Sequence, residues 1–243
     1  TNTGGGYAIN ANGVNEAVVG NSGISDVTSG DVIIKSSSGS SGGVSINQGT
    51  GAIEIYAPIT TTAGRSVNVT NRTATSSVVF PKKISDSGAG INITGNSSGS
   101  TFSFTGGLTL STGGNNAFNV AGGGSDLTRG GTVTVTQNGT TIVNTITTTS
   151  GSALNVSYTN IGASGLTFRS ISSGAGSNVG ISLVSTGTAG GLTVTGLDGG
   201  DVGTDPDLGS GGTITGKTGS DGAPNAGYGV YLNNTSFVSL HGM

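Results

Sequence analysis

Residues 64–110 read GRSVNVTNRTATSSVVFPKKISDSGAGINITGNSSGSTFSFTGGLTL, and this stretch contains the same unit twice in succession. Each unit opens with an apolar–Asn–apolar triplet, VNV at 67–69 and INI at 91–93. A second apolar segment starts nine residues after the end of each triplet, and a third starts four residues after the second ends, at Ile84 and at Leu108. Because successive side chains of a strand point to opposite faces, these short alternating segments predict three β-strands per unit.

The opening triplet recurs along most of the chain. Its starts are separated by 23, 24, 27, 36, 27 and 49 residues. Self-similarity with a period near two dozen residues is typical of a stacked solenoid. The copies, of which the last is the loosest, are Val44-Ser45-Ile46, Val67-Asn68-Val69, Ile91-Asn92-Ile93, Phe118-Asn119-Val120, Leu154-Asn155-Val156, Ile181-Ser182-Leu183 and Val230-Tyr231-Leu232.

Three short strands per unit, each stacked on its counterpart in the preceding unit, predict an all-β fold formed by one chain: a parallel β-helix. We expect about three strands per coil and roughly 8–10 coils that lie about 4.8 Å apart. Right-handed winding is expected because parallel crossover connections are right-handed. Val67 and Val69 would then face the core and Asn68 the solvent. No helix is expected, since apolar residues nowhere recur at helical spacing.

Residues 1–243 are predicted to form a single β-helix domain. Within residues 1–40 the strand signals at 7–9, 18–19 and 32–34 are loosely spaced, which predicts irregular first coils. Residues 197–213 are predicted to be an acidic loop inserted into the solenoid.

Composition excludes several other classes. The 49 glycines of 243 residues do not recur at every third position and are accompanied by only 4 prolines, which excludes collagen. The 8 lysines and arginines and the net charge of −3 provide no basic surface for nucleic acid. No apolar run approaches the ~20 residues that a membrane-spanning helix needs. The absence of cysteine excludes disulfides and thiolate metal sites.

Two regions of the chain resemble a known group of proteins: the repeats between residues 64 and 194, and the ending GVYLNNTSFVSL at 229–240. They resemble the parallel β-helix repeats of large bacterial secreted and surface proteins, such as adhesins and the passenger regions of autotransporters. The resemblance covers about three quarters of the chain. It implies a right-handed helix and an extracellular or cell-surface location, and it implies no particular activity.

Four asparagines, Asn68, Asn92, Asn119 and Asn155, occupy the same outward position of successive units. Stacked amides can hydrogen-bond along such a column, as in the asparagine ladders of other stacked strands. The simpler interpretation is that they only keep the outer face polar. An array of threonine hydroxyls for ordered water is disfavoured, because the outward column changes among Asn, Ser, Thr and Tyr.

The acidic loop contains the only candidate metal ligands. Asp198, Asp201, Asp205 and Asp207 are four of the chain's 11 acidic residues. Ca²⁺ takes six to eight oxygen ligands and fits a glycine-rich loop, so we hypothesise that these carboxylates bind one calcium ion. The alternative is an exposed acidic turn without an ion, and the fold is expected to need no cofactor. Calorimetric titration with calcium is expected to show binding heat. No heat, and no effect of a chelator on the melting temperature, would contradict the hypothesis.

The first functional hypothesis is a non-catalytic structural or adhesive segment of a bacterial surface or fibre-forming protein. A solenoid has unpaired strand edges at its tips, and such edges pair with other strands unless they are capped. The sequence contains no amphipathic segment that would cap them. We therefore expect end-to-end self-association into filaments, or continuation of the coil in a longer protein.

The alternative hypothesis is a glycan-binding or glycan-cleaving β-helix, similar to polysaccharide lyases and hydrolases. Glycoside hydrolysis needs two carboxyl groups about 5–10 Å apart. Outside the acidic loop the carboxylates are dispersed over different corners, and the single histidine, His241, has no expected nucleophilic partner. We therefore expect no enzymatic activity and retain a cell-surface glycan as the candidate partner.

Overall fold

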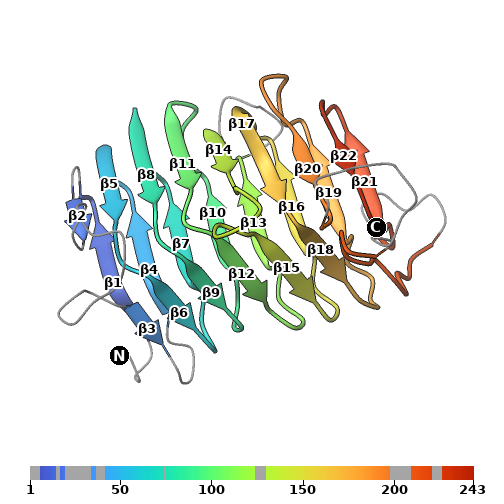
Figure 1. Ribbon diagram of the computed structural model, residues 1–243. Coiled ribbons are helices and arrows are strands. Elements are labelled where there is room, and N and C mark those ends of the chain that lie inside the picture. The colour runs from blue at the N-terminus through green and yellow to red at the C-terminus, as the bar shows by residue number, and fades with distance from the viewer. Residues whose placement is uncertain are drawn as a thin grey trace.

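The computed structural model describes residues 6–14, 17–19, 34–36, 42–73, 75–123, 130–197, 209–220 and 226–243. Within these ranges the chain forms 22 β-strands and no helix. The strands form three parallel sheets, and successive turns of the chain add strands to the sheets in order, to all three from β1 to β18 and to the first two from β19 to β22 (Figure 1). The predicted all-β parallel β-helix is therefore confirmed.

The strands of each sheet follow one another in chain order. The first sheet contains β1 (Tyr7–Asn12), β4 (Gly42–Asn47), β7 (Val67–Thr70), β10 (Ile91–Thr94), β13 (Phe118–Ala121), β16 (Leu154–Ser157), β19 (Ile181–Val184) and β21 (Val230–Asn233). The second contains β2 (Ala17–Val19), β5 (Gly51–Ile55), β8 (Ser76–Phe80), β11 (Ser100–Phe104), β14 (Thr132–Val135), β17 (Asn160–Phe168), β20 (Leu192–Val194) and β22 (Ser239–Leu240). The third contains β3 (Ile34–Ser36), β6 (Ile59–Thr61), β9 (Ile84–Asp86), β12 (Leu108–Ser111), β15 (Thr145–Thr148) and β18 (Ser170–Ser173).

Regular coils make up the middle of the solenoid. From β4 to β18, five consecutive coils contribute one strand to each of the three sheets. They are preceded by β1, β2 and β3, which pair in parallel with β4, β5 and β6. The strands described within residues 1–40 thus follow the same pairing as the later coils.

The predicted triplets are confirmed as the strands of the first sheet, aligned residue for residue. Asn68 pairs with Asn92, and Asn119 pairs with Asn155. Alignment persists where units are longest: Ile181 pairs with Val230 across a 49-residue unit. Within β17 the pairing with β14 shifts between Val133, opposite Ile161, and Val135, opposite Leu166, so extra residues enter there without changing the register of the first sheet. In that sheet a shift of one position would turn every buried side chain outward.

The core consists of the inward side chains of all three sheets. In β10, Ile91 and Ile93 are buried whereas the residues between and after them are partly exposed. A column of phenylalanines runs along the core: Phe80 stacks on Phe104 with ring centroids 4.9 Å apart. Phe118 meets Phe104 edge-on at 5.6 Å and Phe168 at 6.1 Å. Such ring pairs stabilise the core beyond the area that they bury.

The corner after the first sheet repeats one backbone conformation. In seven of the corners, the residue that follows the strand has a left-handed conformation, which glycine and asparagine tolerate best. These residues are Gly13 (φ 68°), Gln48 (φ 59°), Asn71 (φ 56°), Gly95 (φ 67°), Tyr158 (φ 48°), Ser185 (φ 49°) and Asn234 (φ 51°). In four of these corners the next residue is polar and buried: Arg72, Asn96, Thr159 and Thr186.

The third wall of the solenoid continues beyond β18. Ile214 forms a parallel bridge with Ser173, and Lys217 forms one with Gly176. The Lys217 ammonium group donates a hydrogen bond to the Ser173 hydroxyl at 2.7 Å. The segment therefore stacks on the preceding coil as a further, shorter strand-like rung.

Candidate functional site

The four predicted calcium ligands, Asp198, Asp201, Asp205 and Asp207, lie outside the described residues. Among the described residues, no group of three or more His, Cys, Asp or Glu side chains could hold a metal ion. The calcium hypothesis and the predicted loop at 197–213 stay predictions.

The asparagine column forms the predicted hydrogen-bonded ladder. The Asn92 amide donates to Asn68 Oδ1 at 2.9 Å, the Asn119 amide to Asn92 Oδ1 at 2.8 Å, and the Asn155 amide to Asn119 Oδ1 at 2.8 Å. All donors point the same way, toward the preceding coil. The ladder ends at Asn155, whose side-chain oxygen faces the next coil.

Beyond Asn155 the outward column no longer consists of asparagines, and the unequal sizes of the next side chains leave a groove. Its next two members are Ser182 on β19 and Tyr231 on β21. Neighbouring strands lie about 4.8 Å apart, so Asn155 and Tyr231 are separated by roughly 10 Å with only a short serine between them. The parallel column runs from Ser157 through Val184 to Asn233.

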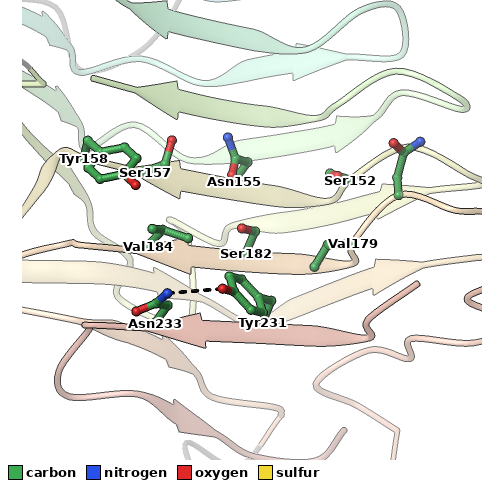
Figure 2. Close-up of a pocket in the computed structure, with 10 residues that line it drawn as sticks. Ser152, Asn155, Ser157, Tyr158, Val179, Ser182, Val184, Tyr231 and Asn233 are labelled. Atoms are coloured by element: carbon green, nitrogen blue, oxygen red, sulfur yellow. Dashed lines mark hydrogen bonds between the residues drawn. The ribbon is translucent and has the colours of Figure 1, made fainter. Parts of the chain in front are cut away.

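This groove has a volume of about 370 Å³. Figure 2 shows its two walls, one from the coil of β16 and one from β21, on either side of the shorter side chains of β19. None of the side chains that line it is charged. They are Ser152, Asn155, Ser157, Tyr158, Asn178, Val179, Ser182, Val184, Tyr231 and Asn233.

Tyr158 stands at one end of the groove in an unfavourable backbone conformation. Its φ of 48° lies in the left-handed region, which costs a residue with a Cβ roughly 1–2 kcal/mol. Its amide N–H donates to the Val184 carbonyl at 2.8 Å, which holds it on the next coil. A side chain at Gly122 or at Gly130 would collide with the Tyr158 carbonyl, so both glycines leave room for this corner.

Aromatic and amide groups form the opposite wall. The rings of Tyr231 and Tyr228 are tilted by 31° with centroids 5.5 Å apart. The Asn233 amide donates to the Tyr231 hydroxyl at 3.2 Å, as the dashed line in Figure 2 shows. The wall therefore offers an aromatic face beside hydrogen-bonding groups.

The most unusual buried group is a guanidinium that the sequence analysis did not single out. Arg72 is only 1% exposed. It donates from Nη1 to the carbonyls of Val14 (2.8 Å) and Gln48 (2.6 Å), and from Nη2 to that of Gly51 (2.9 Å). The Arg72 Nε has no hydrogen-bond partner among the described residues. Burial lowers the pKa of Arg72, although an arginine remains charged in proteins.

One signal in the sequence could have identified Arg72. It follows Asn71, whose corner position directs the next residue inward, and its counterpart one coil earlier is Gly49. A side chain at Gly49 would collide with the Val14 carbonyl and come close to Arg72 Nη1. An arginine at a corner whose counterpart in the preceding coil is a glycine is thus the pattern that indicates a buried arginine.

Two acidic residues fall within the described ranges, Glu54 and Asp86, and they lie in different sheets. Asp86 is buried, and its carboxylate accepts hydrogen bonds from the amides of Ser66 (2.8 Å) and Gly88 (2.7 Å). It satisfies the backbone at the corner after the third sheet. His241 interacts with the Ser239 hydroxyl at 2.6 Å.

The last coil leaves apolar side chains exposed that earlier coils bury. Val230 and Leu232 occupy the inward positions of β21, next to the fully buried Ile181 and Leu183. They are nevertheless 37% and 45% exposed. Phe237, between β21 and β22, is 69% exposed. We call Val230, Leu232 and Phe237 the end face.

Comparison with protein-family models, with curated proteins and with solved structures finds no match to this chain. The fold therefore rests on the pairing pattern itself. In the parts of the chain that the structure describes, no helix is long and apolar enough to cross a membrane.

Proposed function

We propose that this chain is a non-catalytic structural segment of a bacterial extracellular or cell-surface protein, and that its coils extend into a longer stack by joining end to end. The end face is the observation that carries this proposal. Exposed apolar side chains at inward positions, beside the unpaired edges of β21 and β22, favour the addition of another coil.

The first strand at the opposite end of the solenoid, β1, has its inward and outward positions in the same columns as β21. Ile9 and Ala11 of β1 begin the same inward columns that end in Val230 and Leu232. In a head-to-tail stack the bulky Leu232 would meet the small Ala11. Asn233 would meet Asn12, which already accepts a hydrogen bond from the Asn47 amide at 3.0 Å. A second copy of this chain thus continues the pattern that joins its own coils.

The chemistry of the described side chains also supports a role without catalysis. Glu54 and Asp86 lie on different sheets, whereas glycoside cleavage needs two carboxyl groups that face one substrate. Asp86 is moreover engaged by two backbone amides. Outward strand positions are mostly serine, threonine and asparagine, which suit a polar outer wall.

Self-association should be sensitive to charge on the end face. We expect the parent protein to form larger species as its concentration rises, measured by size-exclusion chromatography with light scattering. Leu232→Lys should raise the concentration needed roughly tenfold or more, because a lysine replaces an apolar side chain that becomes buried on stacking. A parent that stays monomeric at high concentration would contradict the proposal.

Thr109→Lys is the matched control. Thr109 is exposed on the outer face of β12, in the middle of the solenoid and far along the chain from either end. This variant carries the same added charge and is expected to associate like the parent. Equal weakening by both variants would show that net charge, and not the end face, governs association.

A further inference from the structure

We propose that the groove between β16 and β21 binds a neutral carbohydrate, with one sugar ring of an uncharged oligosaccharide seated over Ser182. This binding function goes beyond the structural role and uses the side wall of the solenoid, not its end face. Three features of the groove carry the inference: its shape, its chemistry and the strained tyrosine at its edge.

The shape follows from the order of side chains in one column. The column holds three neighbours on successive strands. The side chains of Asn155 and Tyr231 are long, and that of Ser182 between them is short. Two strand spacings of about 4.8 Å separate the long members, which leaves a slot that accepts one pyranose ring. The adjacent column, Ser157, Val184 and Asn233, also lines the groove, and Val184 lies beside Ser182 on the same strand (Figure 2).

The chemistry of the lining fits a sugar better than other ligands. A sugar presents C–H groups on its ring faces and hydroxyls around its rim. Aromatic rings with a polar tip, such as those of Tyr231 and Tyr158, can cover the faces. Amides of Asn155, Asn178 and Asn233 can exchange hydrogen bonds with the hydroxyls. No lining side chain is charged, so nothing compensates the charge of a phosphate, sulfate or nucleic acid.

The end of the asparagine ladder adds a free acceptor to the groove. Every earlier rung of the ladder receives an amide hydrogen from the next coil, whereas the residue after Asn155 in the column is a serine. Among the described residues, β19 supplies no donor to Asn155 Oδ1. A sugar hydroxyl can occupy the place of the missing amide.

Tyr158 provides the second, independent observation. The equivalent corner residue is glycine in two coils and asparagine in two others, which accept the left-handed conformation at low cost, whereas Gln48 and Ser185 are small or unbranched residues that adopt it elsewhere. Here the position holds a bulky tyrosine that borders the groove. Among the corner residues with this strained conformation, Tyr158 is the one whose side chain lines the groove, which fits a side chain kept for contact with a ligand.

The test uses tetrasaccharides as probes: the oligomers of cellulose, starch, xylan, mannan and chitin, with tetragalacturonate as the charged comparison. Binding is measured by saturation-transfer NMR and by calorimetry on the full chain. We expect at least one neutral tetrasaccharide to bind. Tyr231→Ala should weaken it about tenfold or more, and Ser182→Tyr, which fills the slot from an outward position, should abolish it.

Tyr158→Asn separates ligand contact from folding. A role in the fold alone predicts a variant equal to or more stable than the parent with unchanged binding, because asparagine relieves the strain. The proposal instead predicts weaker sugar binding together with a melting temperature at least as high as that of the parent. Tyr56→Ala, which removes a tyrosine outside the groove, should bind like the parent.

Several results would overturn the proposal. These are the absence of binding by every neutral probe at about 10 mM, binding that survives Ser182→Tyr, and preference for tetragalacturonate. Self-association is measured on the same samples, so loss of sugar binding and loss of stacking are told apart.

Discussion

Arg72→Met is expected to lower the free energy of unfolding by about 3–5 kcal/mol. Methionine fills much of the same volume but donates no hydrogen bond. The carbonyls of Val14, Gln48 and Gly51, which come from two preceding coils, would lose the donors that now satisfy them. A buried carbonyl without a hydrogen-bond partner lowers the stability of the fold, and the surrounding apolar contacts do not compensate for this loss. The change should appear as a lower midpoint in urea, followed by circular dichroism.

Arg65→Met is the control for the loss of an arginine. Arg65 is partly exposed and donates one hydrogen bond, from Nη1 to the Ala89 carbonyl at 3.0 Å. Its replacement should cost about 1 kcal/mol. Hydrogen exchange should show that Arg72→Met exposes amides chiefly in β4, β5 and β7, since each coil contacts mainly its neighbours. If both variants lowered the free energy of unfolding by similar amounts, the buried guanidinium of Arg72 would not stabilise the fold more than the partly exposed one of Arg65.

Phe104→Ala is expected to destabilise the middle of the solenoid by about 3–5 kcal/mol. Phe104 is buried between two other rings, with Phe80 stacked at 4.9 Å and Phe118 edge-on at 5.6 Å. Its truncation leaves a cavity that spans adjacent coils and removes both ring contacts. Since a stack of repeats is stabilised by nearest-neighbour contacts, the loss should divide the unfolding transition into two steps.

Phe237→Ala removes the same atoms where they are not packed. Phe237 is 69% exposed, so its truncation should change the free energy of unfolding by no more than about 0.5 kcal/mol in dilute protein. The comparison isolates packing from side-chain chemistry. A Phe104→Ala protein that unfolds at the parent midpoint, in one step, would contradict the proposed role of the phenylalanine column.

The asparagine ladder shows how far a repetitive sequence can predict atomic contacts. Asn92 and Asn119 are 27 residues apart, yet their identical place in the unit predicts their adjacency, and the structure gives a 2.8 Å hydrogen bond. This prediction succeeds because side-chain direction has a period of two and burial penalises any slip in register.

Arg72 shows where the same reasoning stops. Its neighbours in sequence resemble a solvent-exposed turn, and only the carbonyls of Val14, Gln48 and Gly51 make its burial tolerable. Those carbonyls lie between 21 and 58 residues away. The sequence predicted unpaired strand edges at the tips of the solenoid, but it did not identify the apolar side chains of the end face. Val230 and Leu232 read as ordinary core residues until the lack of a covering coil is seen.

The sequence by itself determined the strands, their order around the coil and which side chains enter the core, because these depend on a local alternation repeated in every unit. Only the tertiary structure decided where the outer face of the solenoid forms a groove. The groove exists because Ser182 lies between Asn155 and Tyr231, from which it is separated along the chain by 27 and 49 residues. A contact surface of this kind depends on the relative sizes of side chains that are distant in the chain, and those meet only when the coils stack.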